Sequence, residues 1–279
     1  MQPELTARRV PPSVGDEPVG AGLRFGILGD FEIHLDTRRV DLGGARIRTM
    51  LAVLLVFPGQ PVTMDRLVGF IWSTAPQSAI ANLRTYATAL RRRLDSVAPG
   101  SGARLQTTAN GYLFTASSRE LDMLRFDELA ADGRRQFAAG NIAEAADCFD
   151  RALALWRGHP LADLRYGPML APRITWLQER YLAVLQNGVD AWLAAGREDK
   201  VISEVVRVLE AFPLHEPLWA RLMLALHRSG RRADALAAYR RARQRLIEDV
   251  GIEPGAELRN AHQFILGQES HLVTKGTVR

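Results

Sequence analysis

The sequence is poor in cysteine and has no long apolar run. Its 279 residues include one cysteine, Cys148, which excludes an internal disulfide and a cysteine-based zinc site, and we expect a core thiol there. The longest apolar run, Met50 to Phe57, is far shorter than the roughly 20 residues that cross a bilayer. Residues 1–22 carry charges and prolines where a secretory signal has an apolar centre. These absences predict a cytoplasmic protein with no membrane partner.

The sequence also lacks the motifs of common catalytic and cofactor sites. It contains no GxxxxGK[ST] phosphate loop and no GxGxxG turn. None of its six histidines stands at metal-ligand spacing from another histidine or from the cysteine. We therefore predict that the protein is not an enzyme and holds no metal or cofactor.

The net charge of +5 is concentrated in one part of the chain. Residues 23–118 contain 11 Arg against 6 acids, whereas residues 121–267 contain 20 Lys plus Arg against 20 acids. The length and the 47% hydrophobic fraction leave room for two globular domains. Basic charge confined to one domain is typical of binding to a phosphate backbone, because bound cations release counterions there.

The stretch from Gln77 to Asp95 predicts an amphipathic helix with an unusual polar face. Its apolar stripe comprises Ile80, Leu83, Ala87, Leu90 and Leu94. The opposite face has small or hydroxylated residues around one cation, namely Ser78, Ala81, Thr85, Thr88 and Arg92. Further polar residues flank this face, namely Asn82, Arg84, Arg91 and Arg93.

Short polar side chains let a helix enter the major groove, which is about 12 Å wide, and cations at the margins meet phosphates. We interpret the stretch as a recognition helix in which Arg92 reaches a base and Arg91 or Arg93 reaches phosphate. The alternative is a solvated helix end, where cations also suit the helix dipole.

The elements around this helix predict a winged helix. A small antiparallel sheet is expected from Arg24–Leu35, a turn at Asp36–Arg39, and a return through Val40–Leu42. Two helices should follow, Ile47–Phe57 and Met64–Trp72, the second capped by Thr63. After the basic helix, two short β runs flank Asn110-Gly111, which is a strong hairpin signal. Sheet, helices, basic helix and hairpin together are a winged helix-turn-helix order.

The second half of the sequence contains an internal repeat. Gly140, Gly196 and Gly230 each stand in a small-Gly-polar break between helical segments, and the last two lie at the 34-residue tetratricopeptide period. Small or apolar residues recur at fixed offsets after each glycine, namely Ala145, Phe149 and Ala152, then Val201, Val205 and Val208, then Ala235, Tyr239 and Ala242. An extra segment around Trp156–Arg180 interrupts the array.

Several of these stretches resemble one family. The sequence is similar to the Streptomyces antibiotic regulatory proteins in six stretches. Four lie in the first half: FGILGDFEI, RIRTMLAVLLVFPGQPVTMDRLVGFIW, NLRTYATALRRRL and NGYLF. Two lie in the second half: WRGHPLADL and HEPLWARLMLALHRSGRRADALAAYRRARQRLIEDVGIEPGAEL. The resemblance covers about Leu23 to Gln268. It implies an α+β, OmpR-type winged helix at 23–118 and an all-α, tetratricopeptide-like bacterial transcriptional activation domain at 121–267. A disordered leader (1–22) and a flexible tail (268–279) complete the expected organisation.

Further DNA contacts are expected outside the recognition helix. Arg46, Arg48 and Thr49 open the first helix, where cations and backbone amides can clamp a phosphate, although an ordinary helix start is an equal alternative. In the wing, Arg104 and Asn110 are candidates for the minor groove or its phosphates. The family often has Asn and Arg where this sequence has Ala81 and Ala89, which suggests a different operator or more reliance on DNA shape.

The resemblance implies a cytoplasmic activator of an antibiotic or secondary-metabolite gene cluster. Its expected partners are double-stranded DNA with direct repeats near a promoter −35 element, RNA polymerase holoenzyme including its sigma factor, and a second protomer placed head to tail. Two alternatives stay open: a repeat-type protein scaffold with accessory nucleic-acid binding, and a repressor of the same architecture. The operator, the pathway, any regulatory signal and the oligomeric state off DNA do not follow from the sequence.

Overall fold

The computed structural model describes residues 22–267, which form two compact units. The first unit combines residues 22–131 with 151–182, and the second combines residues 132–150 with 183–267. The tail at 268–279 and all but Gly22 of the leader lie outside the described residues. The units divide inside helices, away from the expected boundary near 118–121, so the expected domain limits stay a prediction.

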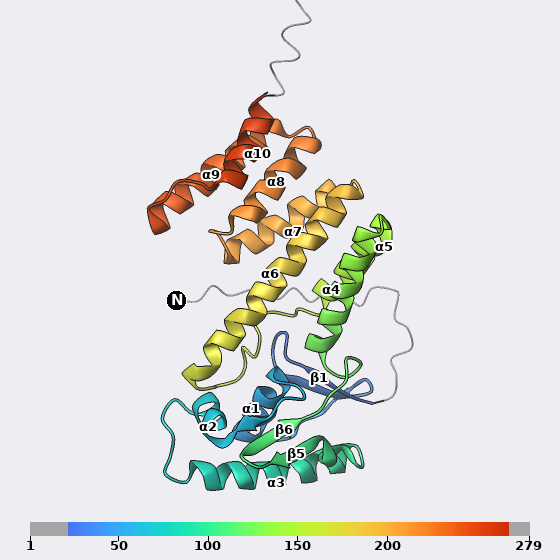
Figure 1. The fold of residues 1–279 in the computed structure, drawn as a ribbon, viewed down its shortest axis with the longest axis vertical. Helices are drawn as coiled ribbons and strands as arrows, with labels where there is room; N and C mark the ends of the chain where they lie inside the picture. Colours follow the sequence, from blue (N-terminus) through green and yellow to red (C-terminus); the bar gives the residue numbers. More distant parts are fainter. Residues whose placement is uncertain (1–21, 268–279) are drawn as a thin grey trace, which may run out of the picture. The chain divides into compact units, whose positions relative to one another are not determined.

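Residues 22–118 of the first unit form two small sheets and helices α1 to α3 in winged-helix order (Figure 1). Strands β1 (Leu23–Gly26), β2 (Glu32–Leu35) and β3 (Arg38–Arg39) form one antiparallel sheet. Helices α1 (Ala45–Val56), α2 (Met64–Ile71) and α3 (Ala79–Val97) follow, with β4 (Val62–Thr63) before α2. After the 3-10 turn η1 (Ser101–Arg104), β5 (Leu105–Thr108) and β6 (Gly111–Phe114) form the wing, and the second sheet has the order β4-β6-β5. The predicted fold class is confirmed.

The first sheet differs from its prediction in two places. The run from Arg24 to Leu35 is two strands, because its middle residues form a loop at Gly29, whose φ is 150°. Asp36, at φ 53°, makes the next turn tight, so the return strand is Arg38–Arg39 and not Val40–Leu42. The alternation of residue types correctly indicated extended chain in this region, but it did not predict the residues at which the chain reverses direction.

The core of the first unit forms around α1. Residues 49–56 of this helix are all buried, and Leu83, Leu90 and Leu94 of α3 pack with them at zero exposure. Thr63 caps α2 as predicted, since its Oγ1 accepts a hydrogen bond from the Arg66 backbone N–H at 3.4 Å. Trp72 is also buried. The helices are therefore held by apolar burial, which leaves the outer face of α3 available.

The wing depends on Gly111, where any other residue would require the neighbouring backbone to shift. A Cβ at Gly111 would lie 1.9 Å from the Val62 carbonyl oxygen, inside the β4–β6 pairing. We expect Gly111→Ala to cost about 2 kcal/mol of stability and to expose the amides of β4 and β6 to hydrogen exchange. Gly22→Ala, which meets nothing within 4 Å, is the control. Equal melting temperatures for the two variants would contradict the expectation.

The chain after β6 is helical. Its elements are α4 (Asp122–Ala138), α5 (Ile142–Ala154), the 3-10 turn η2 (Pro168–Leu170), α6 (Ala171–Ala194), α7 (Glu198–Ala211), α8 (Glu216–Arg228), α9 (Arg232–Val250) and α10 (Ala256–Gly267). None of the helices between residues 22 and 267 is both long and apolar enough for a membrane span.

The three predicted repeat breaks share one geometry. Gly140, Gly196 and Gly230 have φ of 81°, 68° and 76°, the left-handed region in which glycine ends a helix. In each case the residue after the glycine donates its N–H to the carbonyl five residues earlier, at 2.8–2.9 Å. The same hydrogen bonds at the same offset confirm that these segments are equivalent helical hairpins.

The residues at the repeat offsets are buried within the helical hairpins, except Tyr239, which is half-buried. Ala145, Val205 and Ala235 have zero exposure. Tyr239 stacks on His262 of α10, with ring centroids 3.9 Å apart. Cys148 is only half-buried, so the prediction of a core thiol is met in part.

Candidate nucleic-acid interface

Helix α3 lies along the outer edge of the first unit (Figure 1). Ala79, Leu83, Ala87, Leu90 and Leu94 are its buried residues. Ile80 was predicted in this stripe, but its side chain is 43% exposed, and this placement was wrong. The helix begins at Ala79, which fills the buried position instead, and Ile80 is turned to the edge of the packing face.

The opposite face of α3 is exposed and has unpaired cations. Arg84 and Arg92 are exposed, and neither guanidinium has a hydrogen bond or ion pair within residues 22–267. Ser78, Thr85 and Thr88 are exposed beside them, and Asn82 is half-exposed and donates to the Ser78 hydroxyl at 3.2 Å. The acid of this helix, Asp95, accepts the Gly102 backbone N–H at 2.8 Å. Positive charge is therefore uncompensated along the predicted DNA-facing side.

Arg91 and Arg93 fasten α3 to its neighbours. Arg91 donates from Nε to the Leu105 carbonyl at 2.9 Å and from Nη2 to the Thr107 hydroxyl at 2.8 Å. Arg93 donates from Nη1 to the Leu42 carbonyl. Arg91 ties α3 to β5, and Arg93 ties it to the loop after β3. Both side chains keep their positive charge, because carbonyl and hydroxyl acceptors do not neutralise it. Their contact with phosphate stays a prediction.

The two candidate DNA contacts near the wing, Asn110 and Arg104, differ in whether another side chain already binds them. Asn110 is exposed at the tip of the hairpin, and its carbonyl accepts the Met64 backbone N–H at 2.8 Å. Arg104 forms an ion pair with Glu120 at 2.5 Å. Burial favours a higher pKa for Glu120, but hydrogen bonds from Arg104 and Ser117 outweigh it and lower the pKa below its usual value. Arg104 is therefore held by a charged carboxylate, and Asn110 is the freer of the two.

At the start of α1, fewer side chains are exposed and unpaired than the sequence suggested. Thr49 is 2% exposed, and its hydroxyl donates to the Ala45 carbonyl at 3.0 Å, so it no longer belongs among the candidate DNA contacts. Arg48 pairs with Asp163 at 2.7 Å. Arg46 is exposed and donates to the Ile71 carbonyl at 2.6 Å. Of the three predicted residues, Arg46 is the one still presented to solvent with its charge unpaired.

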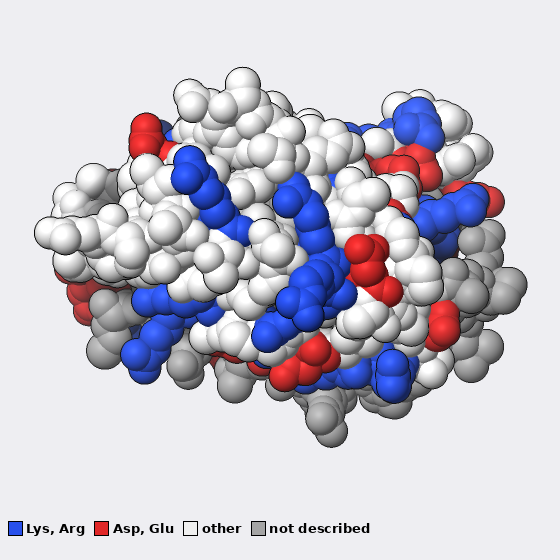
Figure 2. Space-filling model, turned by 90° about the horizontal axis from the view of Figure 1, so that it is seen from below, with Lys and Arg blue, Asp and Glu red and all other residues white. Residues whose placement is uncertain are grey.

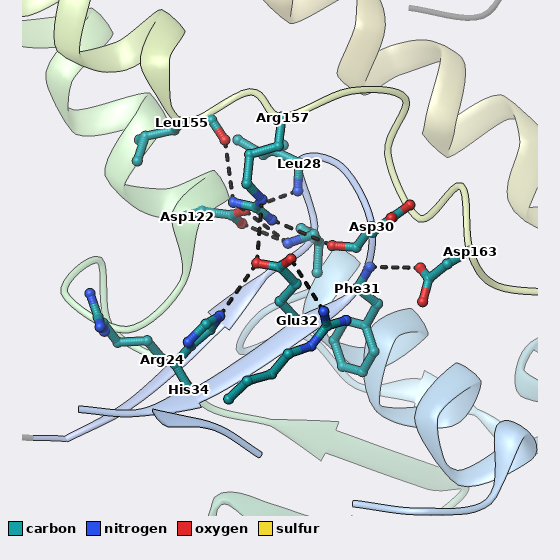
Figure 3. Close-up of polar contacts among 12 residues, drawn as sticks. Arg24, Leu28, Asp30, Phe31, Glu32, His34, Asp122, Leu155, Arg157 and Asp163 are labelled. Carbon is teal, nitrogen blue, oxygen red and sulfur yellow. Dashed lines mark hydrogen bonds and ion pairs between the residues drawn. The ribbon is translucent and has the colours of Figure 1, made fainter. Parts of the chain in front are cut away.

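The partner of Arg48 belongs to the inserted segment, which packs against the first sheet (Figure 3). The Asp163 carboxylate also accepts the Phe31 backbone N–H at 2.7 Å. Asp122 accepts the N–H groups of Ile27 and Leu28 at 2.9 and 3.0 Å and pairs with Arg157 at 3.2 Å. These side chains hold the β1–β2 loop against residues 155–163.

The inserted segment also adds a cation that sequence reasoning missed. Arg165 is exposed, and its carbonyl lies 3.4 Å from the Thr49 hydroxyl at the start of α1. The two residues are 116 positions apart, so no local signal could place them together.

The face on which α3 lies is crossed by cationic side chains (Figure 2). Within residues 22–267 no group of three or more His, Cys, Asp or Glu is placed to hold a metal ion. Exposed cations along one helix face are suited to contact with a polyanion.

Residues 121–266 match the family model of the bacterial transcriptional activator domain. The chain is 35% identical to the regulatory protein AfsR of Streptomyces coelicolor over 95% of this chain and 26% of that protein, so it spans about a quarter of AfsR. It is 32% identical to the regulatory protein DnrI of Streptomyces peucetius over 88% of this chain and 92% of DnrI.

Solved structures also include a relative. Mycobacterium tuberculosis EmbR in complex with a low-affinity phosphopeptide superposes with a TM-score of 0.82 at 33% identity, covering 88% of this chain and 65% of that one.

Proposed function

The chain belongs to the Streptomyces antibiotic regulatory protein family of transcriptional regulators, and on that premise we propose that it is a sequence-specific DNA-binding activator of a biosynthetic gene cluster. The observation that carries the proposal is the exposed face of α3, where Arg84 and Arg92 have no acidic partner among the described residues. A helix with short polar side chains between unpaired cations suits the major groove and its phosphates.

The proposal includes the partners that the family implies. The chain binds direct repeats near a promoter −35 element as head-to-tail protomers, and recruits RNA polymerase holoenzyme through its sigma factor. Direct repeats suit a head-to-tail arrangement because a two-fold dimer would read a palindrome. We place this activity in the cytoplasm, at the nucleoid, and assign the chain no catalytic role.

Salt dependence tests the DNA-binding part of the proposal. We expect affinity for a protected promoter fragment to fall at least about 100-fold between about 50 mM and about 200 mM salt, because each neutralised phosphate contributes about −0.9 to the logarithmic slope. Fluorescence anisotropy on a labelled duplex measures it, after footprinting has defined the fragment. A flat salt response without footprint protection would favour the protein scaffold instead.

Transcription in vitro separates the activator from the repressor. With RNA polymerase holoenzyme and the footprinted promoter, the full chain should raise the run-off transcript. An unchanged or reduced transcript together with a normal footprint would leave DNA binding intact and remove activation.

A further inference from the structure

The first turns of α3 present methyl groups to solvent as well as cations. Ile80, 43% exposed, is the large apolar side chain of this helix that its neighbours cover only in part. Ala81 beside it is exposed. Arg84, one turn later on the same flank as Ile80, is exposed and unpaired among residues 22–267.

Two threonines extend this apolar character. The Thr85 hydroxyl donates to the Ala81 carbonyl at 3.1 Å, and the Thr88 hydroxyl donates to the Arg84 carbonyl at 3.1 Å. Because each hydroxyl hydrogen is engaged within the helix, a ligand meets the methyl group and the oxygen lone pairs. The exposed face between the cations therefore offers fewer hydrogen-bond donors than its residue types suggested.

We propose that Ile80, together with the Ala81 methyl group, contacts the 5-methyl group of thymine in the major groove, so that the operator is read partly through thymine methyls. The inference rests on the proposed function, which places α3 in that groove. Thymine is the base that presents a methyl group there, and an apolar side chain is its natural contact. Burying Ile80 against that methyl also removes apolar surface from water.

Charge favours DNA over a protein as the occupant of this surface. Arg84 and Arg92 lie on the same helix as Ile80, and Asp95, the acid of α3, is engaged by Gly102 near the far end. A duplex presents phosphates on both sides of a groove that contains thymine methyls, which matches an apolar side chain with unpaired cations further along the same helix.

Deoxyuridine scanning tests the inference at the level of one methyl group. Each thymine of the footprinted duplex is replaced singly by deoxyuridine, which keeps every hydrogen-bonding group and removes the 5-methyl. For the full chain we expect affinity to fall roughly threefold to tenfold at one or two positions. Ile80→Ala should lose a similar factor on the thymine duplex and become indifferent to deoxyuridine at one of those positions.

Val206→Ala is the matched control, because Val206 is also 43% exposed but lies on α7 of the second unit; it should keep the wild-type response. Since Ile80 lies at the edge of the packing face and is 43% exposed, we expect Ile80→Ala to lower the melting temperature by no more than about a few degrees. The inference is overturned if replacing thymine by deoxyuridine lowers affinity at no position, or if Ile80→Ala keeps the full loss of affinity on deoxyuridine duplexes. It is also overturned if Ile80→Ala lowers transcription while its affinity for the duplex is unchanged, because that result would indicate a contact with a protein. Loss of all duplex binding by the wild-type chain would instead remove the proposed function.

Discussion

Replacing Asp122 by alanine should lower the free energy of unfolding by about 3 kcal/mol. The Asp122 side chain is 7% exposed, and its carboxylate accepts two backbone N–H groups and the Arg157 guanidinium. Burial raises the pKa of Asp122, while Arg157 and the backbone N–H groups oppose that rise. Truncation would leave these donors and the Arg157 charge without their shared acceptor. Urea denaturation followed by circular dichroism measures the loss.

Glu128→Ala is the control for this measurement. Glu128 lies on the same helix, but it is exposed and pairs with Arg125 only across the helix surface at 3.3 Å. Such pairs contribute little, so its effect should stay within about 0.5 kcal/mol. If Asp122→Ala and Glu128→Ala unfold at the same urea concentration, the network of Asp122 and Arg157 does not hold the inserted segment in place.

Replacing Arg92 by alanine should weaken binding to the footprinted operator roughly 10-fold to 100-fold, because a lost base contact costs about 1 to 3 kcal/mol. Arg92 lies in the middle of the exposed face of α3 and has no partner among the described residues. Binding to duplexes without the operator should change much less. Anisotropy titrations on both duplexes give the specificity ratio.

Arg84 and Arg134 supply the comparisons for Arg92. Arg84→Ala should weaken binding to all duplexes alike and make the salt slope shallower by about 1, as expected for a phosphate contact. Arg134 on α4 is also exposed and unpaired within the described chain, and Arg134→Ala should leave affinity near wild type. If Arg92→Ala matched Arg134→Ala, the assignment of α3 as the recognition helix would be refuted.

Local patterns were sufficient to predict most elements of the fold. Asn110-Gly111 identified the wing, Thr63 identified the cap of α2, and the glycine breaks identified the helical hairpins. These signals act over a few residues, where turn geometry, capping and amphipathic periodicity decide the structure. Exposure at the ends of α3 was less predictable, because a helical wheel does not say where the packing partner ends, and Ile80 was misplaced for that reason.

The candidate site could be predicted in part. The exposed face of α3 was visible in the sequence, because its residue types are a poor choice for burial. The sequence did not predict that Arg48 pairs with Asp163 or that Arg104 pairs with Glu120. Nor did it predict that the surrounding core buries Thr49. Their roles at DNA, like those of the other predicted contacts, stay predictions.

By itself, the sequence determined the order of elements, the concentration of positive charge in the first half, and the repeat period of the second, because each depends on neighbours along the chain. Only the tertiary structure decided that the inserted segment packs against the first sheet and neutralises Arg48. Asp163 is 115 positions from Arg48, and an ion pair of such separation depends on how the whole chain folds. Which cations at the start of α1 stay unpaired is therefore decided by the fold and not by composition.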